Sequence, residues 1–194
     1  MKQRILDISK KHSGIITTSD FEKANINRYQ KEKWIESGEL EKVKYGVYAL
    51  PNTDETIIIF YLFYGNIICA ETALFYYNYS DRVPPAWDIA VVRGTSKTKF
   101  NVDYPHVNAH YISKEHLTYG LDKIKIHGVE FTIFDRDRLI VELIKNENNT
   151  DKETFNKAIQ KYLNDEKKNI QNLLEYARKR NNIKKVRDRL GIWL

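Results

Sequence analysis

Two histidines have a spacing that could bind a metal. His106 and His110 lie four residues apart, which on a helix would place both rings on one face, as in a zinc site. Pro105 and the strand-like pattern after it disfavour a helix there, so we do not expect a zinc site. Cys69 has no neighbouring cysteine or histidine and is expected to be a small buried side chain.

Among enzymes, a metal-dependent nuclease is the main alternative to compare with this sequence. Such a site needs an aspartate on one strand and a carboxylate-x-Lys pair on the next strand to hold the metal. Asp88 lies on an expected strand, but the carboxylate-x-Lys spacings fall in a helical, interrupted segment. They are Asp165-x-Lys167 and Glu166-x-Lys168. The sequence also lacks a phosphate-binding glycine loop and a set of nucleophile, base and oxyanion donor. We therefore predict no enzyme activity, metal or cofactor.

Polar side chains in the first fifty residues are of the types that contact DNA. Arg28 can read guanine, and Asn27 or Gln30 can read adenine. Residues on the following two strands and before the second helix suit phosphates or the minor groove. The candidate DNA-binding residues are Thr17, Thr18, Ser19, Asn27, Arg28, Tyr29, Gln30, Lys33, Lys42, Lys44 and Tyr45.

Three helices and a strand pair would position these side chains. The pattern predicts a first helix over 2–12 and a second from a capping box of Ser19 and Glu22. Asn27 is expected to cap a third helix that ends at Gly38. Two short strands joined at Tyr45-Gly46 then complete a winged helix-turn-helix, in which the third helix enters the major groove.

The third helix has one irregular position. Trp34 and Ile35 are expected to face the core, whereas Arg28, Tyr29 and their neighbours face outward. Lys31 lies one turn before Trp34, where a leucine would be expected. Its ammonium must therefore extend past the apolar surface to reach water.

The remaining chain predicts a second domain of α+β type. We expect a 1–51 winged helix and a 52–194 domain whose helical tail begins at about residue 150. A pair of helices over 54–78, a sheet of about four strands and a helix capped by Asp135 should precede the tail. The expected strands are 87–92, 107–112, 124–127 and 129–134, and the tail helices are 151–164, 167–180 and 182–190.

Charge is unevenly distributed along the chain. The net charge is +6, with ten basic and seven acidic residues in 1–50, ten and thirteen in 51–150, and twelve and six in 151–194. The basic ends favour a polyanionic partner, although lysine-rich surfaces also serve solubility alone. A possible secondary basic surface comprises Arg93, Lys97, Lys99, Arg178, Lys179, Arg180, Lys184 and Lys185. No apolar run is long enough for a membrane span or a signal peptide, so we expect a cytoplasmic protein.

Three stretches resemble AbiEi-type antitoxins of type IV toxin–antitoxin systems, which act in abortive phage infection. They are SGIITTSDFEKANINRYQKEKWIESGELEKVKYGVYALP, ICAETALFYYNYSDRVPPAWDIAVV and GVEFTIFDRDRLIVELIKN. The resemblance implies a repressor that binds inverted repeats in its own promoter. It also implies an antitoxin that counteracts a nucleotidyltransferase-like toxin. It places the DNA-reading helix at Asn27–Ser37 and the wing at Lys42–Tyr48.

Three functions remain open at this point. The leading prediction is the antitoxin and autorepressor, a monomer or weak dimer with two copies on the operator DNA. The alternatives are a nuclease targeted by its winged helix and an adaptor whose winged helix binds only protein. A steep fall of DNA affinity with salt would separate the repressor from the adaptor, because it reports release of counterions from phosphates.

Overall fold

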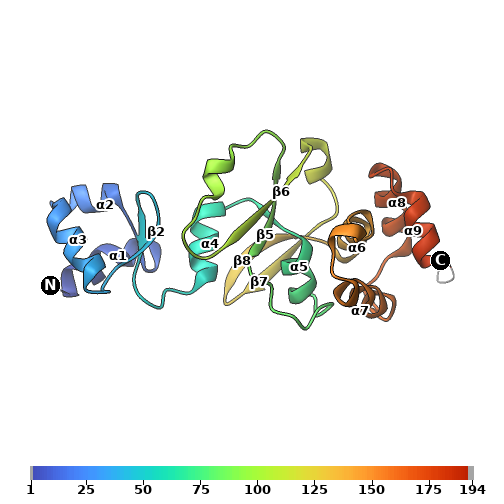
Figure 1. Cartoon of the computed structure of the whole chain (residues 1–194), viewed down its shortest axis with the longest axis horizontal. Helices are drawn as coiled ribbons and strands as arrows, with labels where there is room; N and C mark the ends of the chain where they lie inside the picture. Colours follow the sequence, from blue (N-terminus) through green and yellow to red (C-terminus); the bar gives the residue numbers. More distant parts are fainter. Residues whose placement is uncertain (1, 192–194) are drawn as a thin grey trace. The chain divides into compact units, whose positions relative to one another are not determined.

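The computed structural model describes residues 2–191 (Figure 1). The chain divides into two compact units. The first unit comprises the chain up to residue 64 together with 97–107 and 126–129. The second unit comprises 65–96, 108–125 and the chain from residue 130 onward. The domain boundary at residue 51 stays a prediction.

The first unit contains the predicted winged helix-turn-helix. Its helices are α1 (Lys2–Ser9), α2 (Thr18–Lys23) and α3 (Arg28–Glu36), and its strands are β1 (Ile15–Thr17), β2 (Glu41–Lys44) and β3 (Val47–Ala49). The sheet is antiparallel in the order β1-β3-β2. Ile5, Ile16, Phe21, Trp34 and Tyr48 share one core, so helices and sheet bury their apolar sides together.

The cap of α2 lies two residues before the predicted position. The Thr17 hydroxyl accepts from Asp20 N at 3.2 Å, and the Asp20 carboxylate accepts from Thr17 N at 2.9 Å. Ser19 lies exposed in the first turn of the helix. The predicted capping box of Ser19 and Glu22 is therefore wrong. The reason is that Ile15 and Ile16 are fully buried in β1, which ends at Thr17, so the helix already begins at Thr18.

Helix α3 begins and ends near the predicted residues. Asn27 caps it, Trp34 is 2% exposed, and Gly38 follows the last turn with φ of +70°. Lys31 is half-buried, with its ammonium 5.1 Å from the centre of the Tyr48 ring. This contact is the predicted extension of the lysine past the core, and the ring face favours the cation.

Helix α4 (Glu55–Phe63) and a returning segment complete the first unit. Ile58 of α4 packs with Ile15, Val43 and Ala49 of the wing sheet, and Val102 packs against the same cluster. The backbone N–H of residue 103 donates to the carbonyl of Val43 at 2.8 Å. The 97–107 segment therefore lies along β2, the outer strand of the wing.

The second unit is built on a sheet of five strands. They are β4 (Ile67–Ile68), β5 (Trp87–Val92), β6 (Val107–Ile112), β7 (Leu121–Ile126) and β8 (Val129–Phe134), in the order β6-β5-β4-β8-β7. The predicted four strands were found, and β4 was missed. This two-residue strand lies in the centre of the sheet, antiparallel to β5 and parallel to β8. It separates α4 from α5 (Ala70–Tyr76), where we had predicted only a break between two helices.

The helical tail packs around α6 (Arg136–Lys145), the helix that Asp135 caps as predicted. The tail helices are α7 (Lys152–Leu163), α8 (Ile170–Lys179) and α9 (Ile183–Leu190), and Figure 1 shows them gathered around α6. Leu173, Ala177, Val186 and Leu190 are fully buried. The fold is thus the predicted α+β arrangement of a winged helix, a mixed α/β unit and a helical C-terminus. None of the helices over 2–191 is long and apolar enough to cross a membrane.

Candidate nucleic-acid interface

The outward face of α3 presents the side chains predicted to read DNA. The Arg28 side chain is 86% exposed and Tyr29 is 74% exposed, and Lys33 is exposed one turn later. Trp34, on the opposite side, anchors the helix in the core. The burial of one face and exposure of the other follow from the 3.6-residue period and leave the polar face accessible to a groove.

Asn27 and Gln30 hold the start of α3 with a reciprocal pair of hydrogen bonds. Gln30 N donates to Asn27 Oδ1 at 2.9 Å, and Asn27 N donates to Gln30 Oε1 at 3.1 Å. Both amide oxygens are therefore engaged by the backbone. Reading adenine requires an amide oxygen as well as an amide NH₂ group, so it would compete with this cap. Adenine recognition by Asn27 or Gln30 stays a prediction, whereas their capping role is visible in the structure.

The wing turn is tied to the start of α2. Thr18 N donates to the Gly46 carbonyl at 3.0 Å, and the Thr18 hydroxyl donates to the same oxygen at 3.4 Å. Gly46 has φ of +78°, a left-handed conformation that glycine adopts without strain. Tyr45, beside it, is 95% exposed. The two predicted phosphate-contacting segments are thus joined by main-chain contacts and can approach one ligand together.

Two lysines of the wing differ in their surroundings. Lys42 forms an ion pair of 3.1 Å with Asp103 of the returning segment. Lys44 is half-buried, and burial lowers the pKa of its ammonium below the ordinary value. Asp103 would have to be displaced, or its charge screened, before Lys42 neutralised a phosphate. This partner could not be predicted from the sequence, because sixty residues separate Lys42 from Asp103.

Residues 3–51 match the model of a protein family described as "Transcriptional regulator, AbiEi antitoxin". The winged helix resembles that of AbiEi antitoxins. The match confirms the predicted resemblance of this segment to AbiEi antitoxin transcriptional regulators. This resemblance favours a regulator over an enzyme. No curated protein matches the chain. The resemblance beyond residue 51 stays a prediction.

The predicted secondary basic surface is divided between the two units. Lys97 and Lys99 belong to the unit that carries the AbiEi-like winged helix, on the 3₁₀ helix η2 (Lys97–Phe100). Arg93, Arg178, Lys179, Arg180, Lys184 and Lys185 belong to the second unit.

Arg180 and Lys179 are already engaged in the second unit. The Arg180 guanidinium donates to the Glu142 carboxylate and its side chain is only 11% exposed. Lys179 pairs with Glu175 at 2.6 Å and lies over the Tyr119 ring. Arg178, Lys184 and Lys185 are exposed on α8 and α9. A DNA-binding role for any of these cations stays a prediction.

Within the described chain, the residues that we compared with a nuclease site do not come together to form such a site. Asp88 lies on β5 as predicted, but its carboxylate accepts from His110 Nε2 at 2.8 Å and from Thr72 N at 3.2 Å. Asp165 lies between α7 and α8, where it accepts from Tyr79 and Arg136. Over 2–191 no three His, Cys, Asp or Glu side chains form a metal-binding group. The pairing of Asp88 with His110 was not predicted, because the two lie on different strands.

Proposed function

We propose that the protein is an antitoxin and transcriptional autorepressor that binds inverted repeats in its own promoter. The observation that carries this proposal is the exposed polar face of α3 beside a wing turn tied to α2, on the segment that matches AbiEi regulators. In a helix-turn-helix unit this face lies in the major groove. Arg28 would then read a base and the wing would contact the phosphate backbone.

The proposed partner is double-stranded operator DNA bound by two copies of the chain. A two-fold repeat in DNA matches two identical winged helices, one on each half-site. The protein is proposed to be a monomer or weak dimer when free, with the DNA bringing the copies together. The net charge of +6 favours association with a polyanion.

A fluorescence-polarisation titration tests the DNA-binding part. The full chain is titrated into the duplex from upstream of its own gene and into a scrambled duplex, each at two salt concentrations. We expect tighter binding to the upstream duplex and a steep loss of affinity at higher salt, because phosphate contacts release counterions. Equal binding to both duplexes would overturn autorepression. Absence of DNA binding at low salt would favour the protein-binding adaptor.

The antitoxin part rests on the family resemblance. The proposed target is a nucleotidyltransferase-like toxin encoded beside this chain. Co-expression of the neighbouring gene with and without this chain, scored by growth, tests it. Rescue of growth by a chain carrying Arg28→Ala would show that antitoxin activity is separate from DNA reading. A neighbour that is harmless when expressed alone would overturn this part and leave the repressor proposal standing.

A further inference from the structure

A cavity of about 610 Å³ opens in the second unit, between the sheet and helices α5 and α6. This volume lies within the range of about 300–1,000 Å³ usual for small-molecule sites. One part of its lining is apolar and includes Leu74, Phe134 and Leu139, all buried in the core. A single inorganic anion would leave most of this space empty, so the cavity suits an organic molecule.

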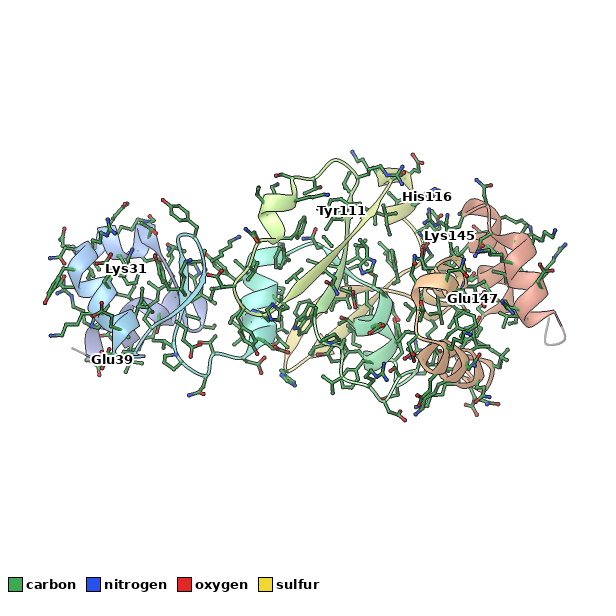
Figure 2. The ribbon with its side chains drawn as sticks, in the orientation of Figure 1. Lys31, Glu39, Tyr111, His116, Lys145 and Glu147 are labelled. Atoms are coloured by element: carbon green, nitrogen blue, oxygen red, sulfur yellow. The ribbon has the colours of Figure 1, made fainter. Side chains whose placement is uncertain are left out.

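Cations gather at the part of the cavity next to the end of α6. Lys145, labelled in Figure 2, forms the last turn of that helix, and Arg93 follows β5. Arg180 lines the cavity beside Lys145, whose ammonium donates to the Arg180 carbonyl at 3.2 Å. Arg138, on the same helix as Lys145, is fully buried and pairs with Glu142. Arg180, Arg138 and Arg93 thus all lie within electrostatic reach of Lys145.

One carboxylate lies directly within this cluster of cations. Glu142 is shared between Arg138 and Arg180, so one negative charge serves two guanidiniums. Two further carboxylates line the cavity: Asp88, which Thr72 and His110 engage, and Glu71 on α5. Burial and then the charges of Arg180, Arg138 and Arg93 lower the pKa of Lys145, against which Glu142 acts. Three guanidiniums thus act on the Lys145 ammonium, and an anion bound there would be attracted by all four cations.

Arg93 is the cation best placed to meet that anion. Its side chain is exposed, and within residues 2–191 it forms no hydrogen bond or ion pair with a carboxylate. A guanidinium can bind a phosphoryl group through two parallel hydrogen bonds, whereas an ammonium acts on it as a point charge. Arg93 and Lys145 together provide both kinds of contact at the mouth of an otherwise partly apolar cavity.

We propose that this cavity binds a small phosphate ester of about mononucleotide size, with its phosphoryl group at Arg93 and Lys145. The organic part of the ligand would lie against Phe134, Leu74 and Leu139. The proposal does not depend on DNA binding by the winged helix, because all of its residues belong to the second unit. Such a site would give a regulator of this kind a way to respond to a metabolite.

Isothermal titration of the full chain tests the proposal with defined probes. The probes are the four ribonucleoside 5′-monophosphates, the matching nucleosides and orthophosphate. We expect saturable binding of at least one monophosphate and about tenfold weaker binding of its nucleoside, since charge-assisted hydrogen bonds to the phosphoryl group are lost. Orthophosphate should compete weakly. Equal affinity for nucleoside and monophosphate, or no saturable binding of any probe, would overturn the proposal.

Two cavity variants and one control assign the binding to these residues. Arg93→Gln and Lys145→Gln should each weaken the monophosphate about tenfold, whereas Lys152→Gln, an exposed lysine on α7 outside the cavity, should not. Thermal melting checks that each variant is folded. If Lys145→Gln does not fold, Arg93→Gln still tests the proposal. The Arg93 side chain is exposed, so its replacement should leave the fold intact. Wild-type binding by Arg93→Gln would overturn the proposal.

A further titration distinguishes binding of a small phosphate ester from binding of the DNA backbone. A scrambled duplex is titrated into the wild type and Arg93→Gln at low salt. The proposal expects equal duplex affinities for the two proteins. A weaker duplex complex for Arg93→Gln, without any mononucleotide binding, would overturn the proposal and place Arg93 on the DNA-binding surface instead.

Discussion

Arg28 is held by a carboxylate of its own helix, with Nε donating to Glu32 Oε1 across 2.6 Å. The pair lies on the exposed face of α3, and the pKa of the guanidinium is raised by the hydrogen bond and charge of Glu32. Glu32 takes Nε, which leaves the two terminal NH₂ groups as an end-on fork of donors. A guanine presents two acceptors that match such a fork. Glu32 can therefore orient Arg28 for base reading.

Changing Arg28 to Ala should weaken operator binding and relax selectivity at one base position. We expect about a tenfold to hundredfold loss at that base pair, the range usual for one bidentate contact. Glu32→Gln is the matched control, because it keeps an acceptor for Nε but removes a negative charge near the DNA. It should retain the base preference and bind all duplexes more tightly. Polarisation titrations against single-base operator variants measure both, and wild-type selectivity in Arg28→Ala would show that another residue reads the base.

Asn27 should contribute to the stability of the winged helix through its cap. Asn27→Ala removes the acceptor for Gln30 N and is expected to cost about 0.5–2 kcal/mol in the free energy of unfolding. Asn27→Asp keeps an acceptor at the positive end of the helix and should be nearly as stable as the wild type. Its added negative charge should still weaken DNA binding. Urea denaturation and polarisation separate the two effects, and equal stability of all three proteins would contradict the capping role.

The sequence was sufficient where the determinants of structure are local. The cap at Asn27, the stop at Gly38 and the strands of the wing each depend on residues within a few positions, and the structure has them as predicted. The cap of α2 was misplaced because Thr17 and Ser19 each have an acidic residue three positions later. Only the burial of β1, which ends at Thr17, distinguishes the two candidate caps.

Contacts between residues far apart in the chain could not be predicted from the sequence. Strand β4 is two residues long, and its place in the sheet depends on β5 and β8. The ion pair of Lys42 with Asp103 and the hydrogen bonds between Glu142 and Arg180 join distant parts of the chain. Residue types and spacing carry no signal for such contacts. The candidate DNA-reading residues could be proposed from the sequence because they share one short helix. The cavity could not, because its lining residues come from several distant elements.

The glycine of the wing turn should be needed for both stability and DNA binding. At φ of +78°, Gly46→Ala is expected to cost about 1–2 kcal/mol in backbone strain. The added methyl would meet Thr18 Oγ1 only at 3.5 Å, an ordinary contact, so the cost comes from the backbone. Gly38→Ala is a matched control, since its φ is +70° and nothing lies near its Cβ. Both should lower the melting temperature, but only Gly46→Ala should weaken DNA binding, because only Gly46 positions the wing.

The buried carboxylate of Glu142 should make the second unit sensitive to acid. Burial alone would raise the pKa of Glu142, but the hydrogen bonds and charges of Arg180 and Arg138 outweigh it and hold the pKa below the ordinary value. A carboxyl group whose pKa is lower in the folded protein contributes stability above the pKa it has when unfolded. That contribution is lost as the pH falls through the folded-state pKa. Denaturation of the wild type over the acid range should therefore show falling stability.

Glu142→Gln should remove that acid-dependent contribution and destabilise the protein at neutral pH. The substitution leaves Arg138, which is fully buried, and Arg180 without their shared counter-charge. We expect it to lower the free energy of unfolding by about 3–5 kcal/mol. Glu175→Gln is the matched control, because Glu175 is exposed and pairs with Lys179 on the surface. Its effect should stay within about 0.5 kcal/mol, as is usual for exposed pairs. Equal stability losses for the two variants at neutral pH would show that the buried network does not hold the tail on α6.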